Sequence, residues 1–169
     1  EGTKNWSLNR VEGVHRSDRL LTPYFPEAML EMQNKSRALM VKRWEENDVK
    51  VEEFMLDDAE FVVVAYGISA RVAKEAILKL REEGHKIGMI RPITLFPFPK
   101  ESFRKLDYTK VKGFIDIELA IPAQMRDDIA LEVKDRAPIY EYCRSGGFLF
   151  DDDGVYTAVK KILDGGASQ

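Results

Sequence analysis

The sequence contains few of the residues that build metal centres and disulfide scaffolds, with one cysteine and two histidines among 169 residues. Cys143 alone cannot form an internal disulfide bond or supply the four thiolates of an iron–sulfur cluster. His15 and His85 lie far apart and lack the spacing of a zinc site. We therefore expect neither a disulfide-stabilised secreted domain nor a metal site in this chain.

Long apolar runs and an excess of positive charge are also absent. No apolar run approaches the ~20 residues that span a bilayer. A net charge of −3 and a pI near 5.6 argue against nucleic acid as the main partner. We therefore expect a cytoplasmic protein without membrane or nucleic-acid partners. The first residue is Glu1 rather than Met, without a leader peptide, so we also expect a processed chain or a piece of a longer one.

What is present describes an ordinary folded domain, with 44% hydrophobic and 33% charged residues. Residues 1–25 show no periodicity, and Pro26 opens a helical pattern that continues to Glu46. The pattern then changes, because strands and helices alternate. Strands are expected at 50–55, 60–65, 87–93, 111–119 and 138–143, and helices at 69–83, 100–106, 123–134 and from 153 onward. The alternation predicts a doubly wound α/β domain with helices on both faces of a parallel sheet.

Ligands of such sheets bind beyond the carboxyl ends of the central strands. After the strand 60–65, Gly67 and Ser69 are expected at a helix N-terminus, with Ser69 as the N-cap and Arg71 one turn further on. Free N–H groups and a cation would suit an anion there. The alternative is an ordinary capped helix, since Gly67 lacks the other glycines of a dinucleotide fingerprint.

A second candidate position follows the strand 111–119. Glu118 ends this strand and Gln124 opens the next helix. A carboxylate at that end of a strand could act as a base or bind a cofactor nitrogen. A solvated or interface glutamate is the alternative.

The connection 91–99 is unusually apolar, because it carries Ile93 and three further large apolar side chains. Solvated loops are seldom so apolar. The segment either folds back onto the core or forms a patch that another chain covers, and the sequence leaves both open. The candidate interface residues are Arg91, Leu95, Phe96 and Phe98.

Other reactive groups favour structural roles. Cys143 is expected in a buried strand as a small core residue, because His85 lies at the opposite end of a strand. The acidic run 151–153 is expected to cap the last helix rather than bind a cation. No Ser-His-Asp set or Walker loop is present, which argues against a stand-alone hydrolase or transferase. We expect no catalytic residue in this chain.

Three blocks and their spacing resemble the alpha subunit of the 2-oxoacid:ferredoxin oxidoreductases. They are AYGISARVAK at 65–74, REEG at 81–84 and RPITLFPFP at 91–99. The resemblance covers roughly residues 5–163, and the third block is quite specific. Glu118 and Gln124 match the family pattern, whereas its Asn and Gly between them are replaced. Residues 5–8 and 27–53 are most similar to the 2-ketoisovalerate branch, followed by the 2-oxoglutarate branch.

The resemblance implies a domain like the C-terminal domain of transketolase. That fold is a three-layer α/β/α sandwich around a five-stranded, mostly parallel sheet with one antiparallel edge strand. Here 50–55 would be the antiparallel edge and 60–65 would be central. Residues 1–48 would be an N-terminal arm and helix, left from a linker to an upstream domain, and residues 49–169 would be the α/β domain.

The resemblance also implies a supporting role in a complex that converts 2-oxoacids to acyl-CoA and reduces ferredoxin. Thiamine diphosphate, Mg²⁺, CoA and iron–sulfur clusters would lie elsewhere in the complex, with none in this chain. The partners would be the upstream alpha-subunit domain, beta-, gamma- and delta-type subunits and, through the complex, ferredoxin. The residues themselves leave one alternative open, a regulatory domain that binds an anion or small ligand.

Overall fold

The computed structural model describes residues 26–165, so the arm expected over residues 1–25 lies outside it. The chain divides into two compact units, residues 1–42 and 43–169. Most of helix α1 (Glu27–Asn47) belongs to the first unit, and none of its residues is buried. The helix confirms the expected element within one residue. Within residues 26–165, no helix has both the length and the apolar character needed to cross a membrane.

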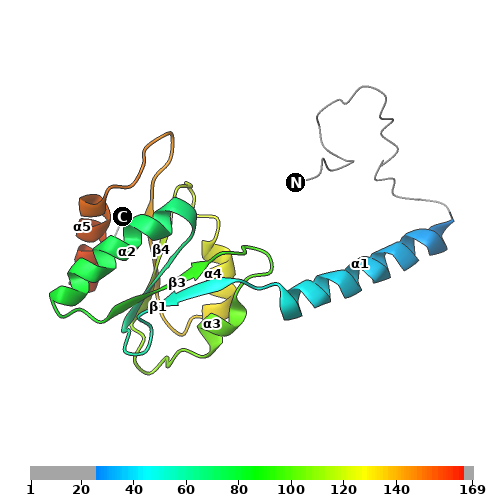
Figure 1. The fold of residues 1–169 in the computed structure, drawn as a ribbon, viewed down its shortest axis with the longest axis horizontal. Coiled ribbons are helices and arrows are strands. Elements are labelled where there is room, and N and C mark those ends of the chain that lie inside the picture. The colour runs from blue at the N-terminus through cyan, green and yellow to red at the C-terminus, as the bar shows by residue number, and fades with distance from the viewer. Residues whose placement is uncertain (1–25, 166–169) are drawn as a thin grey trace, which may run out of the picture. The chain divides into compact units, whose positions relative to one another are not determined.

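The larger unit is built on one five-stranded sheet in the order β1-β3-β2-β4-β5 (Figure 1). Strand β1 runs antiparallel to β3, and every other pair is parallel. The antiparallel edge strand and the central strand are therefore those that the sequence predicted. The strands are β1 (Val51–Phe54), β2 (Phe61–Ala65), β3 (Ile87–Pro92), β4 (Gly113–Glu118) and β5 (Ile139–Cys143).

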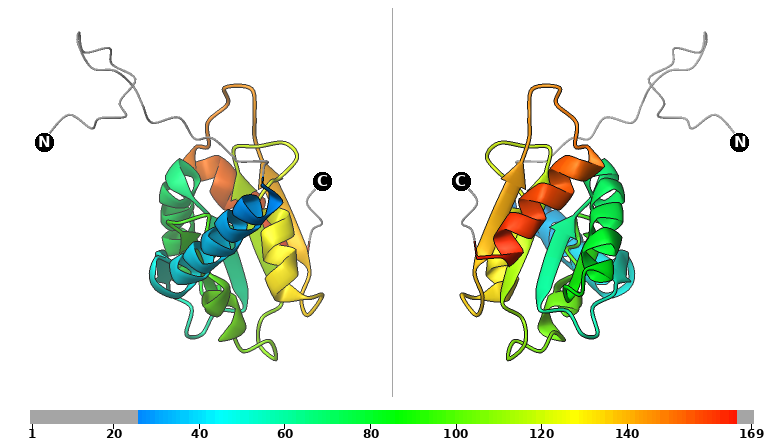
Figure 2. Two further views of the ribbon diagram at one scale, coloured as in Figure 1. Left: turned by 90° about the vertical axis from the view of Figure 1, so that its right-hand side faces the viewer. Right: turned by 90° about the vertical axis from the view of Figure 1, so that its left-hand side faces the viewer.

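Helices cover both faces of this sheet, as the two side views in Figure 2 show. The α2/α5 face carries α2 (Gly67–Glu82) and α5 (Asp152–Leu163), and the α3/α4 face carries α3 (Lys100–Arg104) and α4 (Arg126–Val133). The three-layer α/β/α architecture is thereby confirmed. The connection between β5 and α5 extends beyond the carboxyl edge of the sheet.

Strand β2 is central because its apolar run is suited to burial on both faces. Val62, Val63, Val64 and Ala65 have no exposed surface. Alternate side chains point to opposite faces, so Val63 and Ala65 join the α2/α5 core while Val62 and Val64 join the α3/α4 core. A parallel sheet covered on both sides requires such a continuous hydrophobic run.

The two cores differ in composition. Helix α2 presents small residues to the sheet, including Ala70, Ala73 and Ala76, which allows close approach of the helix. The α3/α4 core is built around stacked aromatic rings. Phe103 lies 5.3 Å from Phe98 and 5.9 Å from Phe114, measured between ring centroids.

Two helix starts test the predicted caps with opposite results. Helix α2 begins at Gly67, and Tyr66 occupies the N-cap position without a side-chain cap. The expected N-cap at Ser69 is therefore wrong, because Gly67 adopts a φ of +57° and the N-cap lies three residues earlier, at Tyr66. At α5 the expected cap is confirmed, since Asp151 accepts a 2.6 Å hydrogen bond from the backbone N–H of Gly154.

Cys143 does not lie in a fully buried strand as expected. Strand β5 pairs only with β4 and forms the edge of the sheet, so Cys143 is half-buried. Burial still raises the pKa of the thiol to about 11, and the neighbouring Asp116 carboxylate adds to that shift. The thiol therefore stays protonated near neutral pH, which fits a packing role.

Candidate functional site

Glu118 lies at the carboxyl end of β4 and holds the start of α4. Its carboxylate is fully buried and accepts a 2.6 Å hydrogen bond from the backbone N–H of Met125. The hydroxyl of Tyr66 donates a second hydrogen bond at 3.5 Å. A carboxylate at a helix N-terminus is stabilised by the free N–H groups and by the helix dipole. Glu118 is therefore an internal anchor for α4 and not the solvated or interface glutamate of the alternative.

Gln124, the second residue expected at this edge, is exposed. Glu118 has no exposed surface, so the structure does not place the two side chains on one accessible surface. Whether either residue contacts a ligand stays a prediction.

Gly67, Ser69 and Arg71 follow Tyr66, which bonds Glu118, but none of the three forms a hydrogen bond or ion pair with Glu118. They belong to the first turns of α2, which packs on the α2/α5 face, whereas Glu118 points toward α4. Ser69 is buried and Arg71 is exposed. The five candidate ligand residues therefore form two separate groups. Anion binding at the N-terminus of α2 stays a prediction that rests on Gly67 and Arg71.

Sequence reasoning missed Asp116, which is also fully buried on β4. Neither of its carboxylate oxygens has a hydrogen-bond partner. Burial raises the pKa of Asp116 to about 8, and the negative charge of Glu118 contributes to the same shift. The segment Ile115-Asp116-Ile117-Glu118 carried a signal for this pair, because residues two apart on a strand share a face.

The described part of the chain shows no group of side chains suited to a metal ion. Within residues 26–165, no three His, Cys, Asp or Glu side chains gather closely enough to hold a metal ion. The run 151–153 serves the start of α5, with Asp151 as the cap and Asp152 and Asp153 in the first turn.

The apolar connection 91–99 divides between core and surface. Phe98 is 8% exposed and stacks on Phe103, so its expected role at an interface is wrong. The neighbouring apolar side chains point outward. Phe96 contacts Trp44 edge-to-face, with 6.5 Å between ring centroids. We call the exposed group the apolar patch: Ile93 (57% exposed), Leu95 (47%), Phe96 (63%) and Trp44 (38%).

Backbone hydrogen bonds fix the shape of this connection. The N–H of Ile93 donates to the carbonyl of Lys50 at 2.9 Å. The hydroxyl of Thr94 accepts from the N–H of Lys50 at 3.0 Å and donates to the carbonyl of Pro97 at 3.1 Å. These bonds tie the connection to the start of β1. The apolar patch is thus presented on a structured loop, which lowers the entropy cost of covering it.

Arg91 has a structural role at the start of the same connection. Its guanidinium lies 3.0 Å from a carboxylate oxygen of Glu52 on β1, and Lys74 of α2 binds the other oxygen. The hydrogen bonds from Lys74 and Arg91 hold the pKa of Glu52 below its usual value. Arg91 therefore pairs within the domain with Glu52, which also binds Lys74, and its expected place in a subunit interface stays a prediction.

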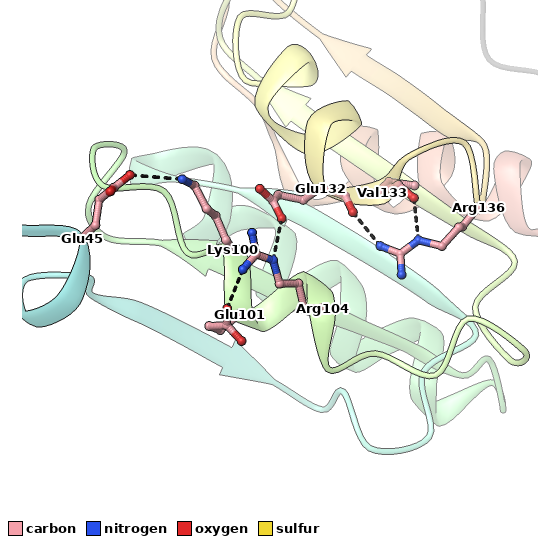
Figure 3. Close-up of polar contacts among 7 residues, drawn as sticks. All are labelled: Glu45, Lys100, Glu101, Arg104, Glu132, Val133 and Arg136. Carbon is pink, nitrogen blue, oxygen red and sulfur yellow. Dashed lines mark hydrogen bonds and ion pairs between the residues drawn. The ribbon is translucent and has the colours of Figure 1, made fainter. Parts of the chain in front are cut away.

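Charged groups link the end of α1 to α3, and α3 to α4 (Figure 3). Arg104 of α3 binds Glu132 of α4 at 3.1 Å and Glu101 at 2.8 Å. Arg136 donates to the last carbonyls of α4, which need partners at a helix end. The ion pair between Glu45 and Lys100 spans 3.1 Å. The guanidinium of Arg136 donates hydrogen bonds to the carbonyl of Val133 at 2.8 Å and to the carbonyl of Glu132 at 2.6 Å.

The fold is a three-layer α/β/α domain built on a five-stranded mixed sheet. The family of the pyruvate:ferredoxin oxidoreductase core domain II matches residues 59–153. This match covers more than half of the chain, and the chain therefore belongs to that family. The resemblance found in the sequence blocks is confirmed.

Curated relatives narrow the comparison. The ketoisovalerate oxidoreductase subunit VorB of Methanothermobacter marburgensis is 53% identical to this chain over 121 positions. The aligned region covers 70% of this chain and 33% of VorB. The pyruvate synthase subunit PorA of Pyrococcus horikoshii is 40% identical over 81 positions, covering 47% of this chain and 20% of PorA. The chain thus spans about a third of the length of its VorB relatives.

Solved structures confirm the fold. The 2-oxoglutarate:ferredoxin oxidoreductase of Magnetococcus marinus superposes with a TM-score of 0.63 at 20% identity, covering 82% of this chain and 24% of that one. A split-gene transketolase superposes with a TM-score of 0.55 at 17% identity, covering 68% of this chain and 42% of that one. Both contain the same type of three-layer domain.

Proposed function

We propose that this chain is part of the alpha-type subunit of a 2-ketoisovalerate:ferredoxin oxidoreductase, in which it supports subunit assembly. The complex would convert a branched 2-oxoacid and CoA to an acyl-CoA and CO₂, and would pass the two electrons to ferredoxin. The observation that carries the proposal is the 53% identity to a ketoisovalerate oxidoreductase subunit over 70% of the chain. Relatives named for pyruvate are less similar, which favours the branched substrate.

The residues of this chain do not fit the redox cofactors of such a complex. A cluster with four thiolate ligands needs more than the single cysteine, and the pKa of Cys143 is raised to about 11, which opposes formation of the thiolate. The described residues also lack a three-ligand group for a metal ion. As the family resemblance implies, we propose that thiamine diphosphate, Mg²⁺, CoA and the clusters lie in other parts of the complex.

An assembly role is supported by the apolar patch. A partner that covers Leu95 and Phe96 would remove large apolar side chains from water, and each such side chain contributes about 1.5–3 kcal/mol when fully buried. Glu45, which follows Trp44 of the patch in the sequence, pairs with Lys100, and such paired charges suit a polar rim. Beta-, gamma- and delta-type subunits or an upstream domain of the same polypeptide are the proposed partners.

Purification of the natural complex through an affinity tag on this chain tests the proposal. We expect co-purification of further subunits with thiamine diphosphate and iron–sulfur clusters. The complex should reduce ferredoxin with 2-ketoisovalerate and CoA at a higher kcat/KM than with pyruvate or 2-oxoglutarate. Higher kcat/KM with 2-oxoglutarate would overturn the substrate assignment, and recovery of the chain without any subunit would overturn the assembly role.

A further inference from the structure

Two carboxyl groups lie on the same face of β4 in the interior of the domain. Asp116 and Glu118 are both fully buried, and their side chains point to the same face of the sheet because they lie two residues apart on β4. Glu118 accepts hydrogen bonds from Met125 and Tyr66, whereas both oxygens of Asp116 have no hydrogen-bond partner. An unpaired carboxylate in such a place is costly.

The hydrogen bonds show which of the two groups keeps its negative charge. Both contacts of Glu118 come from donors, and one of them is the N–H group at the start of α4, which favours an ionised acceptor. Asp116 has no such donor. Two ionised carboxylates can only accept, so they cannot satisfy each other, whereas a protonated carboxyl group can donate to its neighbour.

The charged and titratable groups that face Asp116 come from every element around it. Glu141 lies opposite Asp116 on β5, and Arg126 of α4 forms a 2.5 Å ion pair with Glu141. Arg126 lowers the pKa of Asp116, but burial and the charges of Glu118 and Glu141 raise it by more. The remaining groups are Glu118 on β4, Cys143 on β5 and Tyr66 after β2, while Asp128 on α4 interacts with Glu118.

We infer that Asp116 and Glu118 form a buried acid–carboxylate pair that holds one proton through the neutral range, and that this proton secures the start of α4 on the sheet. Asp116 carries the proton and donates to Glu118, and Glu118 binds the N–H of Met125. Loss of the proton in alkaline solution places two like charges together and loosens the connection between β4 and α4. This inference is independent of the proposed function.

The sign of the pH effect follows from the raised pKa of Asp116. The unfolded chain releases this proton near the ordinary aspartate pKa of about 4, whereas the folded chain keeps it to about pH 8. Between these values the folded state binds more protons, so the contribution of Asp116 to stability falls as the pH rises. Above the folded-state pKa the contribution is constant again.

Thermal unfolding of the full chain with Asp116→Asn tests the inference. The asparagine has nearly the same shape, stays neutral and can donate to Glu118 at every pH. We expect the melting temperature of the wild-type chain to fall relative to this variant by more than about 5 °C between pH 5 and pH 9. Asp135→Asn makes the same chemical change at an exposed position and should follow the wild-type pH profile.

Carbon-13 NMR of aspartate side chains in the wild-type chain gives a second measurement that needs no variant. One aspartate should remain protonated at pH 7 and titrate near pH 8. Exchange of the Met125 amide, corrected for its intrinsic pH dependence, should accelerate over the same range. Ionisation of every aspartate at pH 7, or parallel melting profiles of the wild-type chain and Asp116→Asn, would overturn the inference.

Discussion

The carboxylate of Glu118 and the backbone N–H of Met125 are 2.6 Å apart, and this bond joins the end of β4 to the start of α4. A fully buried acid thus replaces the solvent-exposed N-cap that most helices use. The bond also sets the environment of Asp116, which shares a face of β4 with Glu118.

The anchor makes Glu118 important for stability. Glu118→Ala would leave the N–H of Met125 without a partner and open a cavity, and we expect a loss of about 2–4 kcal/mol in the free energy of unfolding. Urea denaturation measures this loss. Glu75→Ala removes the same kind of side chain from the exposed surface of α2 and should change stability by less than about 0.5 kcal/mol. Equal effects of the two substitutions would show that Glu118 is no anchor.

Two phenylalanines of the same connection should respond differently to truncation. Phe98 is stacked in the α3/α4 core, so Phe98→Ala should cost about 3–4 kcal/mol of unfolding free energy. Phe96 is 63% exposed and contacts only the edge of Trp44 among aromatic rings in residues 26–165, so Phe96→Ala should cost less than about 1 kcal/mol. Chemical denaturation of both variants provides the comparison, and a reversed order would contradict the assignment of core and patch.

Cys143 should react slowly with thiol reagents. The chain has one cysteine, so any thiol that a reagent labels in this chain is Cys143. Because its pKa is raised to about 11, the thiolate fraction at pH 8 is about two orders of magnitude below that of a free thiol. The rate of alkylation should rise steadily with pH up to about pH 11. A fast reaction at pH 7 would indicate an activated thiol instead.

Anion binding by α2 remains the alternative to a purely supporting role. If Gly67 and Arg71 bind an anion, inorganic phosphate or CoA should raise the melting temperature of the chain. Arg71→Ala should abolish that rise, whereas Lys79→Ala near the other end of α2 should not. Melting curves that are insensitive to both ligands would remove this alternative.

The order and types of the elements could be predicted from the sequence because hydrophobic patterns determine them. The alternation of patterns located the strands at 50–55 and 60–65, whereas their places as antiparallel edge and central strand came from the family resemblance. Local geometry could not be obtained in this way. The helix start at Gly67 depends on a positive φ, and the exposure of Cys143 depends on which strand ends the sheet.

The candidate sites could be predicted only in part, because burial is a property of the whole fold. Leu95 and Phe96 are exposed, as the alternative of an apolar patch predicted, whereas Phe98 two residues later packs in the core. Glu118 was singled out from its position at a strand end, but its bond to Met125 needs the path of the following loop. Asp116 was missed because the sequence of a strand does not show whether a charged side chain on it is buried or solvated.

The central claim is that the apolar patch holds this chain in a larger complex, and a charge placed on the patch tests it most directly. The tagged natural complex should be purified with Phe96→Asp and, as a matched control, with Leu131→Asp, since Leu131 is 69% exposed on α4 outside the patch. We predict that Phe96→Asp leaves the fold intact and reduces recovery of partner subunits at least tenfold, while Leu131→Asp retains them. Full recovery of the partner subunits with Phe96→Asp would contradict the claim.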